Sequence, residues 1–464
     1  MPSLLRALVP VAAALGVAHA AAATTITVAT FPDLDRAAKA ALPRWHAAHP
    51  DVDVKIVSLQ YADHHTAMTT ALATGSGLPD VMAIDFKFIG KFAGSGGFED
   101  LNKPPYSAGA LRPRFVGYTF AQATNAAGEL AALPADIGPG TLLYRADLIA
   151  KAGLTEADLT RSWDSFIAAG AKLKAATGAD LLADSADIVD IVLRSNLPPG
   201  EGIYFDRAGK VLVDGARFVH AFELGRAAQK AGIAAGATIW TNEWVAGFRN
   251  NRIAGAMMGA WLAGHLKNWL APDTAGKWRS APLPAGATIW TNEWVAGFRN
   301  NRIAGAMMGA WLAGHLKNWL APDTTGKWRS APLPAGATAS YGGSFYAIPK
   351  RAAHKPEAWE FVRFMTADKQ TQLASLRTLD TFPALLAAQQ DPVMDEPMSF
   401  LGGQKARELW RDIAAKVPAI PVDKYDSMAT DVVRAEYQNV ITQGKDIRAA
   451  LADAKSLIEH RARR

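Results

Sequence analysis

Hydrophobic and polar residues alternate along the first third of the chain in two different periods. Short runs of β-branched and apolar residues, such as TITVAT at 25–30, have the period of a strand. Longer segments between them place apolar residues at helical spacing. The predicted strands are residues 25–30, 52–59, 81–84 and 141–144. The predicted helices are residues 33–49, 63–74, 163–176, 214–231, 356–365, 404–415, 425–440 and 446–460. Strands that alternate with helices predict an α/β protein with a parallel, layered sheet.

Local signals set the expected ends of several helices. Asp63 is expected to cap the helix that follows it, and Ser162 to cap the helix at 163–176. Pro43 lies inside the first predicted helix, so we expect that helix to kink or restart there.

The extreme amino terminus reads as an export signal. Arg6 precedes an apolar run at residues 7–17, and Ala18-His19-Ala20 forms an A-x-A cleavage site. The run is too short to span a bilayer, and no later stretch is long and apolar enough to do so. We therefore predict residues 1–20 to be a signal peptide cleaved near Ala20. Because the chain has no cysteine, nothing at that site can carry a lipid anchor.

A segment of fifty residues occurs twice. Residues 235–288 match residues 285–338 at every position except one, where Ala275 is replaced by Thr325. Solenoid repeats need at least three units and tolerate drift between them, whereas here there are two near-identical units. The copies at 236–285 and 286–335 therefore indicate a recent duplication or a sequence-assembly error, with one copy extra to the fold.

The duplication also changes how the charge is interpreted. The 464 residues carry a formal charge of +6, which by itself suggests an acidic partner such as nucleic acid. Each copy contributes +3, and the predicted signal peptide contributes +1, so a chain with one copy and no signal carries only +2. No basic stripe remains, and we do not expect nucleic-acid binding.

Motifs for catalysis and metal binding are missing. The absence of cysteine excludes disulfides, thiolate zinc sites and a cysteine nucleophile. His46 and His49 have ligand-like spacing but no evident third ligand, and the adjacent His64 and His65 are a weaker signal. The sequence contains no nucleophile elbow, Walker A or HExxH motif. We expect no metal, no cofactor and no enzymatic activity.

Several segments, in order along the chain, resemble those of extracellular solute-binding proteins of carbohydrate ABC importers, of the maltose-binding-protein type. The segments are TITVATF, ALATGSGLPDVMAIDFKFIGKF, LPADIGPGTLLYRADLIAKAGL, SWDSF, NNRIAGAMMGAWLAGHLKNW and GGSFYAIPK followed by KPEAWEFVRFMTADKQ. The resemblance implies two α/β lobes (a type II-like periplasmic-binding-protein fold) joined by crossing strands near 137–140, 341–345 and 378–382. It implies an N-terminal lobe of residues 21–137 and 345–379, and a C-terminal lobe of 138–344 and 380–464. It also implies a freely diffusing periplasmic monomer that delivers a sugar to membrane permease subunits.

Candidate ligand residues lie where strands end. Sugars need hydrogen-bonding groups together with flat aromatic faces, and ligands of α/β sheets bind beyond strand ends. Phe31 and Asp33 follow the first strand. Asp85, Phe86 and Lys87 follow the third, where the resemblance also places ligand contacts. Asp85 could equally cap the next helix.

The remaining candidates lie near the crossings. Tyr144 is expected to be a core residue, so only Asp136 is nominated at the first crossing. Trp311, or its twin Trp261, matches the stacking tryptophan of the family, with a core role as the alternative. We favour Trp311, because the second copy leads directly into the crossing at Tyr341. The others near the second crossing and a late helix are Tyr341, Gly343, Ser344 and Tyr425.

Two alternatives to a sugar receptor stay open at this point. One is a secreted carbohydrate-active enzyme, although the Asp and Glu residues are too numerous to nominate a catalytic pair. The other is a binding protein for a different solute, such as a polyol phosphate, an anion or a polyamine. An anion would require convergent basic residues, and only Lys87 suggests one.

Overall fold

The computed structural model describes residues 23–182, 184–198, 200–234, 298, 301 and 303–463. The strands are β1 (Thr24–Thr30), β2 (Val52–Ser58), β3 (Val81–Asp85), β4 (Ala132–Arg145), β5 (Gly305–Gly309), β6 (Trp328–Ala331), β7 (Ser340–Ala347) and β8 (Phe382–Pro383). The helices of the first half are α1 (Leu34–Ala48), α2 (Tyr61–Thr74), α3 (Ile89–Ala93), α4 (Thr119–Gln122), α5 (Ala146–Lys151), α6 (Glu156–Thr160), α7 (Trp163–Thr177), α8 (Ala186–Arg194) and α9 (Ala216–Lys230). Those of the second half are α13 (Trp311–His315), α14 (Lys355–Ala367), α15 (Lys369–Leu379), α16 (Leu386–Gln389), α17 (Ala406–Lys416), α18 (Asp426–Gln443) and α19 (Ile447–Ala462). Short 3₁₀ turns lie at Ala108–Arg114, Pro322–Thr324, Pro334–Gly336, Pro392–Asp395 and Ser399–Leu401, and a π-helical turn at Leu316–Leu320.

The amino-terminal strands form the parallel part of the sheet. β1 pairs in parallel with β2 on one side and with β3 on the other, as the alternation of strands and helices predicts. Residues 81–84 of β3 are fully buried, which agrees with a continuous apolar run covered on both faces. β7 pairs with β3 in the antiparallel direction, and β4 is antiparallel to each strand with which it pairs among the described residues. The expected parallel sheet is therefore wrong beyond β3, because the strands that cross between the lobes run against the direction of their neighbours.

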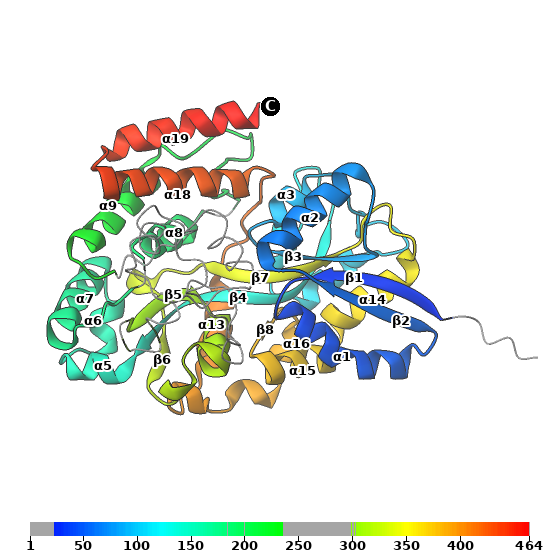
Figure 1. The fold of residues 1–464 in the computed structure, drawn as a ribbon, viewed down its shortest axis with the longest axis horizontal. Helices are drawn as coiled ribbons and strands as arrows, with labels where there is room; N and C mark the ends of the chain where they lie inside the picture. The colour runs from blue at the N-terminus through cyan, green and yellow to red at the C-terminus, as the bar shows by residue number, and fades with distance from the viewer. Residues whose placement is uncertain are drawn as a thin grey trace, which may run out of the picture.

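The long strand β4 connects two groups of elements. Its first half pairs with β7 and β8, and its second half pairs with β5 and β6, so that one strand serves both ends of the sheet. Figure 1 shows β4 and β7 running across the middle of the molecule. We call the elements around β1, β2, β3, α1, α2, α3 and α14 the N-terminal lobe. Those around β5, β6, α5 to α9, α18 and α19 are the C-terminal lobe.

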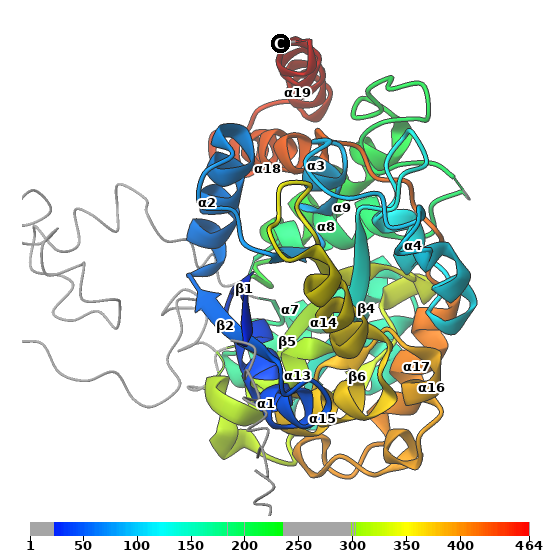
Figure 2. The ribbon, with the colours of Figure 1, turned by 90° about the vertical axis from the view of Figure 1, so that its right-hand side faces the viewer.

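Each lobe has its own buried side chains. The C-terminal lobe contains one core among β4, β5, β6 and α7, and a second among α8, α9, α18 and α19. The largest core fills the N-terminal lobe and continues past the crossing to α13 and α17. α18 also lies next to α3, so the last helices of the chain reach the N-terminal lobe (Figures 1 and 2). This arrangement is a two-lobed α/β fold joined by crossing strands, as expected.

The predicted elements agree with the structure within a few residues, with three corrections. The expected strand at 141–144 is only the end of β4. The helix at 63–74 begins at Tyr61, so Asp63 lies in its first turn and does not cap it. α1 continues through Pro43 and does not restart. The Ser162 cap is confirmed, because its side chain accepts a hydrogen bond from the backbone N–H of Ser165.

The second copy of the repeated segment supplies elements of the fold. Its described residues form β5, α13 and β6, and both strands pair with β4. The first copy, 236–285, with Trp261 and the predicted core pair Met257-Met258, lies outside the described residues, as does the predicted signal peptide. The expected limits of the two lobes along the chain stay predictions.

Candidate ligand-binding site between the lobes

The strand register aligns two predicted carboxylates with a serine. Asp85 of β3 is opposite Ser344 of β7, and Asp136 of β4 is opposite the same serine. Residues directly opposite each other on antiparallel strands project from the same face. The three side chains therefore form a row across three adjacent strands at the junction of the lobes. β4 has register shifts on both sides of Asp136, the type of irregularity that redirects a side chain near a site.

Asp85 is held by polar neighbours on the N-terminal side. Its Oδ1 accepts a hydrogen bond from the Tyr61 hydroxyl at 2.6 Å and from the Lys87 backbone N–H at 2.9 Å. Burial raises the pKa of Asp85 to about 6, against these hydrogen bonds, which favour its ionised form. The capping alternative is wrong, because α3 begins at Ile89 with Phe88 at its N-cap position.

Asp136 carries a side-chain oxygen whose hydrogen-bonding capacity is unused. Burial raises the pKa of Asp136 to about 6, and the neighbouring carboxylates of Asp85 and Asp33 add to the rise, while hydrogen bonding from Ser344 opposes it. Within the described part of the chain, the buried Oδ1 atom of Asp136 has no hydrogen-bond partner. A buried acceptor without a donor is costly, so this atom is suited to a hydroxyl of a bound molecule.

A cluster of aromatic rings packs next to Asp85. His65 of α2 stacks on Phe88, with ring centroids 4.1 Å apart, and also contacts Phe31. Its Nδ1 lies 2.7 Å from the Tyr61 carbonyl, and its Nε2 accepts from the Asp85 backbone N–H at 3.2 Å. These contacts require a neutral imidazole with the proton on Nδ1, and burial accordingly lowers the pKa of His65 to about 3. The two adjacent histidines of the sequence are therefore buried residues that contact the backbone of β3 next to the site.

Asp33 connects β1 to α13. Its Oδ2 lies 2.9 Å from Nε2 of His315, and Arg36 pairs with its Oδ1. Burial acts to raise the pKa of Asp33, but His315 and Arg36 outweigh it and lower the pKa to about 2. The backbone of Asp33 has a φ of 74°, a region that non-glycine residues rarely adopt and that is found at binding sites.

Trp311, at the start of α13, lies against the second crossing. Its Nε1 donates to the Tyr341 carbonyl at 2.9 Å. A Cβ atom on Gly342 would approach Trp311 Nε1 to 2.5 Å, and Gly342 has a φ of 119°. Only glycine lets the crossing strand pass so close to the indole. Trp311 is partly buried and packs on the main core, and its stacking on a ligand stays a prediction.

Phe86 and Tyr341 face each other from the two sides of the junction. Their ring centroids are 6.1 Å apart, and the Phe86 backbone N–H donates to the Gly343 carbonyl at 2.9 Å. The Tyr341 hydroxyl donates to Oδ2 of Asp190 in α8 at 3.4 Å. The guanidinium of Arg194 lies over both rings. These residues supply aromatic faces beside the row of carboxylates.

Two predicted residues are placed differently from the rest. Lys87 reaches across the junction, where its Nζ lies 3.0 Å from Oδ1 of Asp431 in α18, so it is already paired. Tyr425 precedes α18 and packs against Phe205 and under Lys424. It lines a groove of about 540 Å³ between α3 and α18 that is also lined by Phe88 and Asp431.

The structure thus brings most of the predicted residues together, and adds some that the sequence did not indicate. Those at the junction are Phe31, Asp33, Asp85, Phe86, Asp136, Trp311, Tyr341, Gly343 and Ser344. The additional residues are Tyr61, His65, Asp190, Arg194 and His315. Tyr61 could have been found by the rule that selected Asp33 and Asp85, because it follows the end of β2. Tyr144 is buried, and its hydroxyl donates to Glu156, as expected of a core residue.

The described residues contain no group of three or more potential metal ligands. His46 is half-exposed near Asp53, and His49 stacks on Trp45. Carboxylates, hydroxyls and aromatic faces meeting between two lobes are typical of a site that holds a polar organic solute.

Fold and site together define a two-lobed solute-binding protein. The chain belongs to the bacterial extracellular solute-binding protein family, whose model matches residues 29–372. This is a family of binding proteins and not of enzymes, which removes the secreted-enzyme alternative.

Named relatives and solved structures agree with this assignment. The chain is 27% identical over 411 residues to a lactose-binding protein of Rhizobium radiobacter, covering 87% of this chain and 84% of the relative. It is 25% identical over 249 residues to an arabinooligosaccharide-binding protein of Bacillus subtilis (strain 168), covering 52% of this chain and 55% of that protein. Its fold is similar to that of a binding protein from B. animalis subsp. lactis Bl-04 in complex with β-1,6-galactobiose. The TM-score is 0.69 at 19% identity, with 94% of this chain and 97% of that chain covered.

Proposed function

We propose that this protein binds an uncharged mono- or oligosaccharide between its lobes and delivers it to the permease of an ABC importer. The observation that carries the proposal is the row of Asp85, Ser344 and Asp136, with the Asp136 Oδ1 unpartnered among the described residues. Such a row can accept hydrogen bonds from several sugar hydroxyls, while Phe86, Tyr341 and Trp311 offer faces for the C–H surface of a ring. The names of the lactose-binding and arabinooligosaccharide-binding relatives support the same ligand class.

As a member of an extracellular solute-binding family, the protein is exported. We infer that export uses residues 1–20, that cleavage occurs near Ala20, and that the mature protein is a periplasmic monomer without a lipid anchor. No helix in the described part of the chain is long and apolar enough to cross a membrane.

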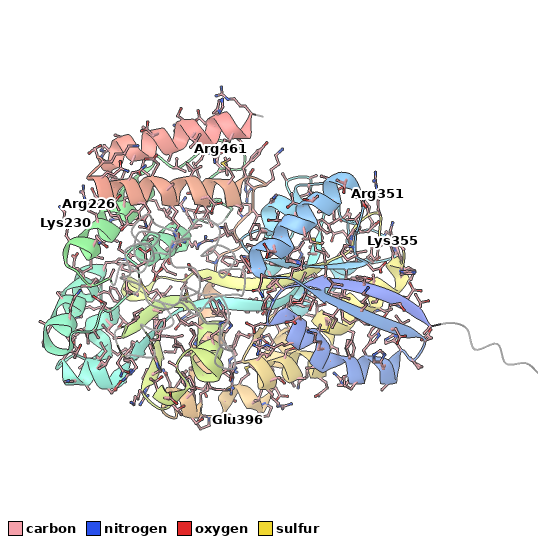
Figure 3. The ribbon with its side chains drawn as sticks, in the orientation of Figure 1. Arg226, Lys230, Arg351, Lys355, Glu396 and Arg461 are labelled. Atoms are coloured by element: carbon pink, nitrogen blue, oxygen red, sulfur yellow. The ribbon has the colours of Figure 1, made fainter. Side chains whose placement is uncertain are left out.

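Nucleic acid is not among the partners we propose. Figure 3 shows Arg226 and Lys230 of α9 at one end of the molecule, and Arg351 and Lys355 at the opposite end. These four basic side chains do not form the single basic patch that is typical of a nucleic-acid-binding face.

A ligand screen on the purified mature protein tests the proposal. Isothermal titration would compare lactose, β-1,6-galactobiose, maltose and arabinooligosaccharides with spermidine and glycerol 3-phosphate. We expect at least one sugar to bind in the micromolar range or tighter, and the polyamine and the phosphate not to bind. Binding of only the polyamine or the phosphate would replace the sugar with that other solute, and binding of nothing would contradict the proposal.

A variant pair locates the site. Asp85→Asn keeps the shape of the side chain and removes the charge, so it should weaken sugar binding roughly 10–100-fold, the loss expected for a hydrogen bond to a charged group. Asp412→Asn, on the exposed side of α17, is the matched control and should bind like the wild type. Equal affinity of Asp85→Asn and the wild type would place the site elsewhere.

A further inference from the structure

Arg194 occupies a position between the aromatic residues of the junction. It is the last residue of α8, in the C-terminal lobe. Its Cζ atom lies 5.4 Å from the ring centroid of Phe86 and 5.8 Å from that of Tyr341. Phe86 belongs to the N-terminal lobe and Tyr341 to the crossing strand, so one side chain contacts both sides of the junction. The sequence did not indicate this residue.

The hydrogen-bonding capacity of this guanidinium is not fully used. A guanidinium carries five N–H donors in a rigid plane and no acceptor. The Nε atom of Arg194 is buried, and among the residues that the structure describes it has no acceptor. Leaving a buried donor of a charged group without a partner is unfavourable, so such a group calls for an explanation. Here the donor belongs to a guanidinium that lies over Phe86, the residue next to Asp85 in the sequence.

The charges around Arg194 select the kind of ligand. Asp190 and Asp426 interact electrostatically with the guanidinium, and so does Asp85 across the junction. Burial raises the pKa of Asp426 to about 7, so this carboxylate is only partly ionised near neutral pH. Asp85 and Asp190 suffice to compensate a single positive charge. A ligand with a carboxylate or phosphate of its own would be repelled by these groups, whereas hydroxyl and ring oxygens could accept from Arg194 without that cost.

We propose that Arg194 is a ligand-contacting specificity residue, whose guanidinium donates to hydroxyl or ring oxygens of an uncharged sugar held beside Phe86 and Tyr341. This inference rests on the proposed function and deepens it, since it names the donor that complements the acceptors Asp85 and Asp136. It also assigns the site to neutral sugars in preference to uronates and sugar phosphates.

Arg194→Lys tests the role of the planar donor group. Lysine keeps the positive charge among Asp85, Asp190 and Asp426 but loses the fork of donors. Titration with lactose, or with the neutral disaccharide that the wild type binds most tightly in the panel, should show affinity reduced roughly 10–100-fold. The melting temperature without ligand should stay within about 3 °C of the wild type, because the positive charge among the three carboxylates is conserved. Arg194→Gln, which also removes the charge, should bind at least as weakly.

Arg112→Lys is the matched control. Arg112 also lies over an aromatic ring, that of Phe120 at 5.3 Å, but it is exposed on the N-terminal lobe. This variant should keep both the sugar affinity and the melting temperature of the wild type. A difference confined to position 194 would separate ligand contact from the general loss of a cation–π interaction.

The outcomes separate this inference from the function on which it rests. If the wild type binds no sugar, the proposed function fails and the role of Arg194 fails with it. If the wild type binds and Arg194→Lys binds within twofold of it, the function stands and this inference is wrong. If both variants at position 194 lose the folded state, Arg194 is a structural residue, which also overturns the inference. A wild type that binds galacturonate more tightly than galactose would contradict the assignment to neutral sugars, for which we expect at least a tenfold preference.

Discussion

At the scale of single residues, the environment of Asp33 makes the stability of the folded protein depend on pH. His315 and Arg36 hold it ionised, so its pKa in the folded protein, about 2, is below the ordinary value of 3.8. A depressed pKa means that the unfolded chain binds the proton first as the pH falls. The stabilisation that Asp33 provides is therefore complete above pH 4 and is lost between about pH 4 and pH 2.

Asp33→Asn should remove this contribution. We expect the variant to be less stable than the wild type by about 2 kcal/mol at pH 7, and the difference to shrink towards zero near pH 2. Urea unfolding at several pH values measures it. Asp412→Asn, an exposed carboxylate, should show no such difference. A gap that is the same at pH 7 and pH 2.5 would mean that the Asp33 side chain acts through packing and not through its charge.

Some residues of the site were within reach of the sequence, and others were not. Asp33 and Asp85 follow strand ends, and the same rule includes Tyr61, which follows the end of β2. Arg194 could not be predicted in this way. Its role depends on the end of α8 meeting Phe86 and Tyr341, which are distant in sequence and are brought together only by the crossing strands.

At the scale of elements, eight of the helices were predictable because their apolar spacing and caps are local properties, as at Ser162, whereas α8 and α15 were not predicted. The long strand β4 was predictable only in part: its pattern gives a strand at 141–144 and the resemblance gives a crossing near 137–140, whereas Pro134, Pro139 and the glycines around them hide its full length. These prolines are tolerated since β4 changes its pairing partners along its length and has register shifts near Asp136. The same prolines and register shifts that make the strand hard to predict also set the position of Asp136 in the site.

The contact between α13 and β7 gives a prediction about backbone geometry. Gly342→Ala would place a Cβ atom against Trp311 in a positive-φ conformation, so it should destabilise the protein by roughly 2–4 kcal/mol. Gly77→Ala isolates the effect of φ, because Gly77 has a φ of 70° with nothing within 4 Å, and should cost about 1 kcal/mol. Chemical denaturation compares the two. If both variants lose the same free energy of unfolding, the close approach of Trp311 to the crossing strand does not contribute to stability.

Because the segment is repeated, Trp311 has an identical counterpart, Trp261, in the first copy. α13 and β5, formed by the second copy, place Trp311 against Tyr341, so Trp311→Ala should weaken sugar binding by at least tenfold. Trp261→Ala changes the identical position of the other copy and should leave the affinity unchanged. Titration of both variants decides between the copies. Loss of binding in Trp261→Ala alone would assign the site to the first copy.

At the scale of the whole molecule, several contacts among the described residues join the lobes around the site. Asp33 meets His315, Arg194 lies over Phe86, and Lys87 pairs with Asp431. The last pair is partly exposed, with 33% and 64% of the side chains accessible, so it contributes little to the stability of the contact between the lobes. The row of Asp85, Ser344 and Asp136 lies at this junction. A solute bound there would be enclosed by both lobes.

The most direct test of this account is calorimetric titration of the mature protein and its Asp136→Asn variant with the sugar that binds most tightly in the panel. The amide keeps the volume of the side chain but replaces one acceptor oxygen by an NH₂ group. We predict one sugar per chain for the wild type and an affinity reduced roughly 10–100-fold for the variant, with an unchanged fold by circular dichroism. A variant that binds the sugar as tightly as the wild type would contradict the claim that the ligand is held at this row between the lobes.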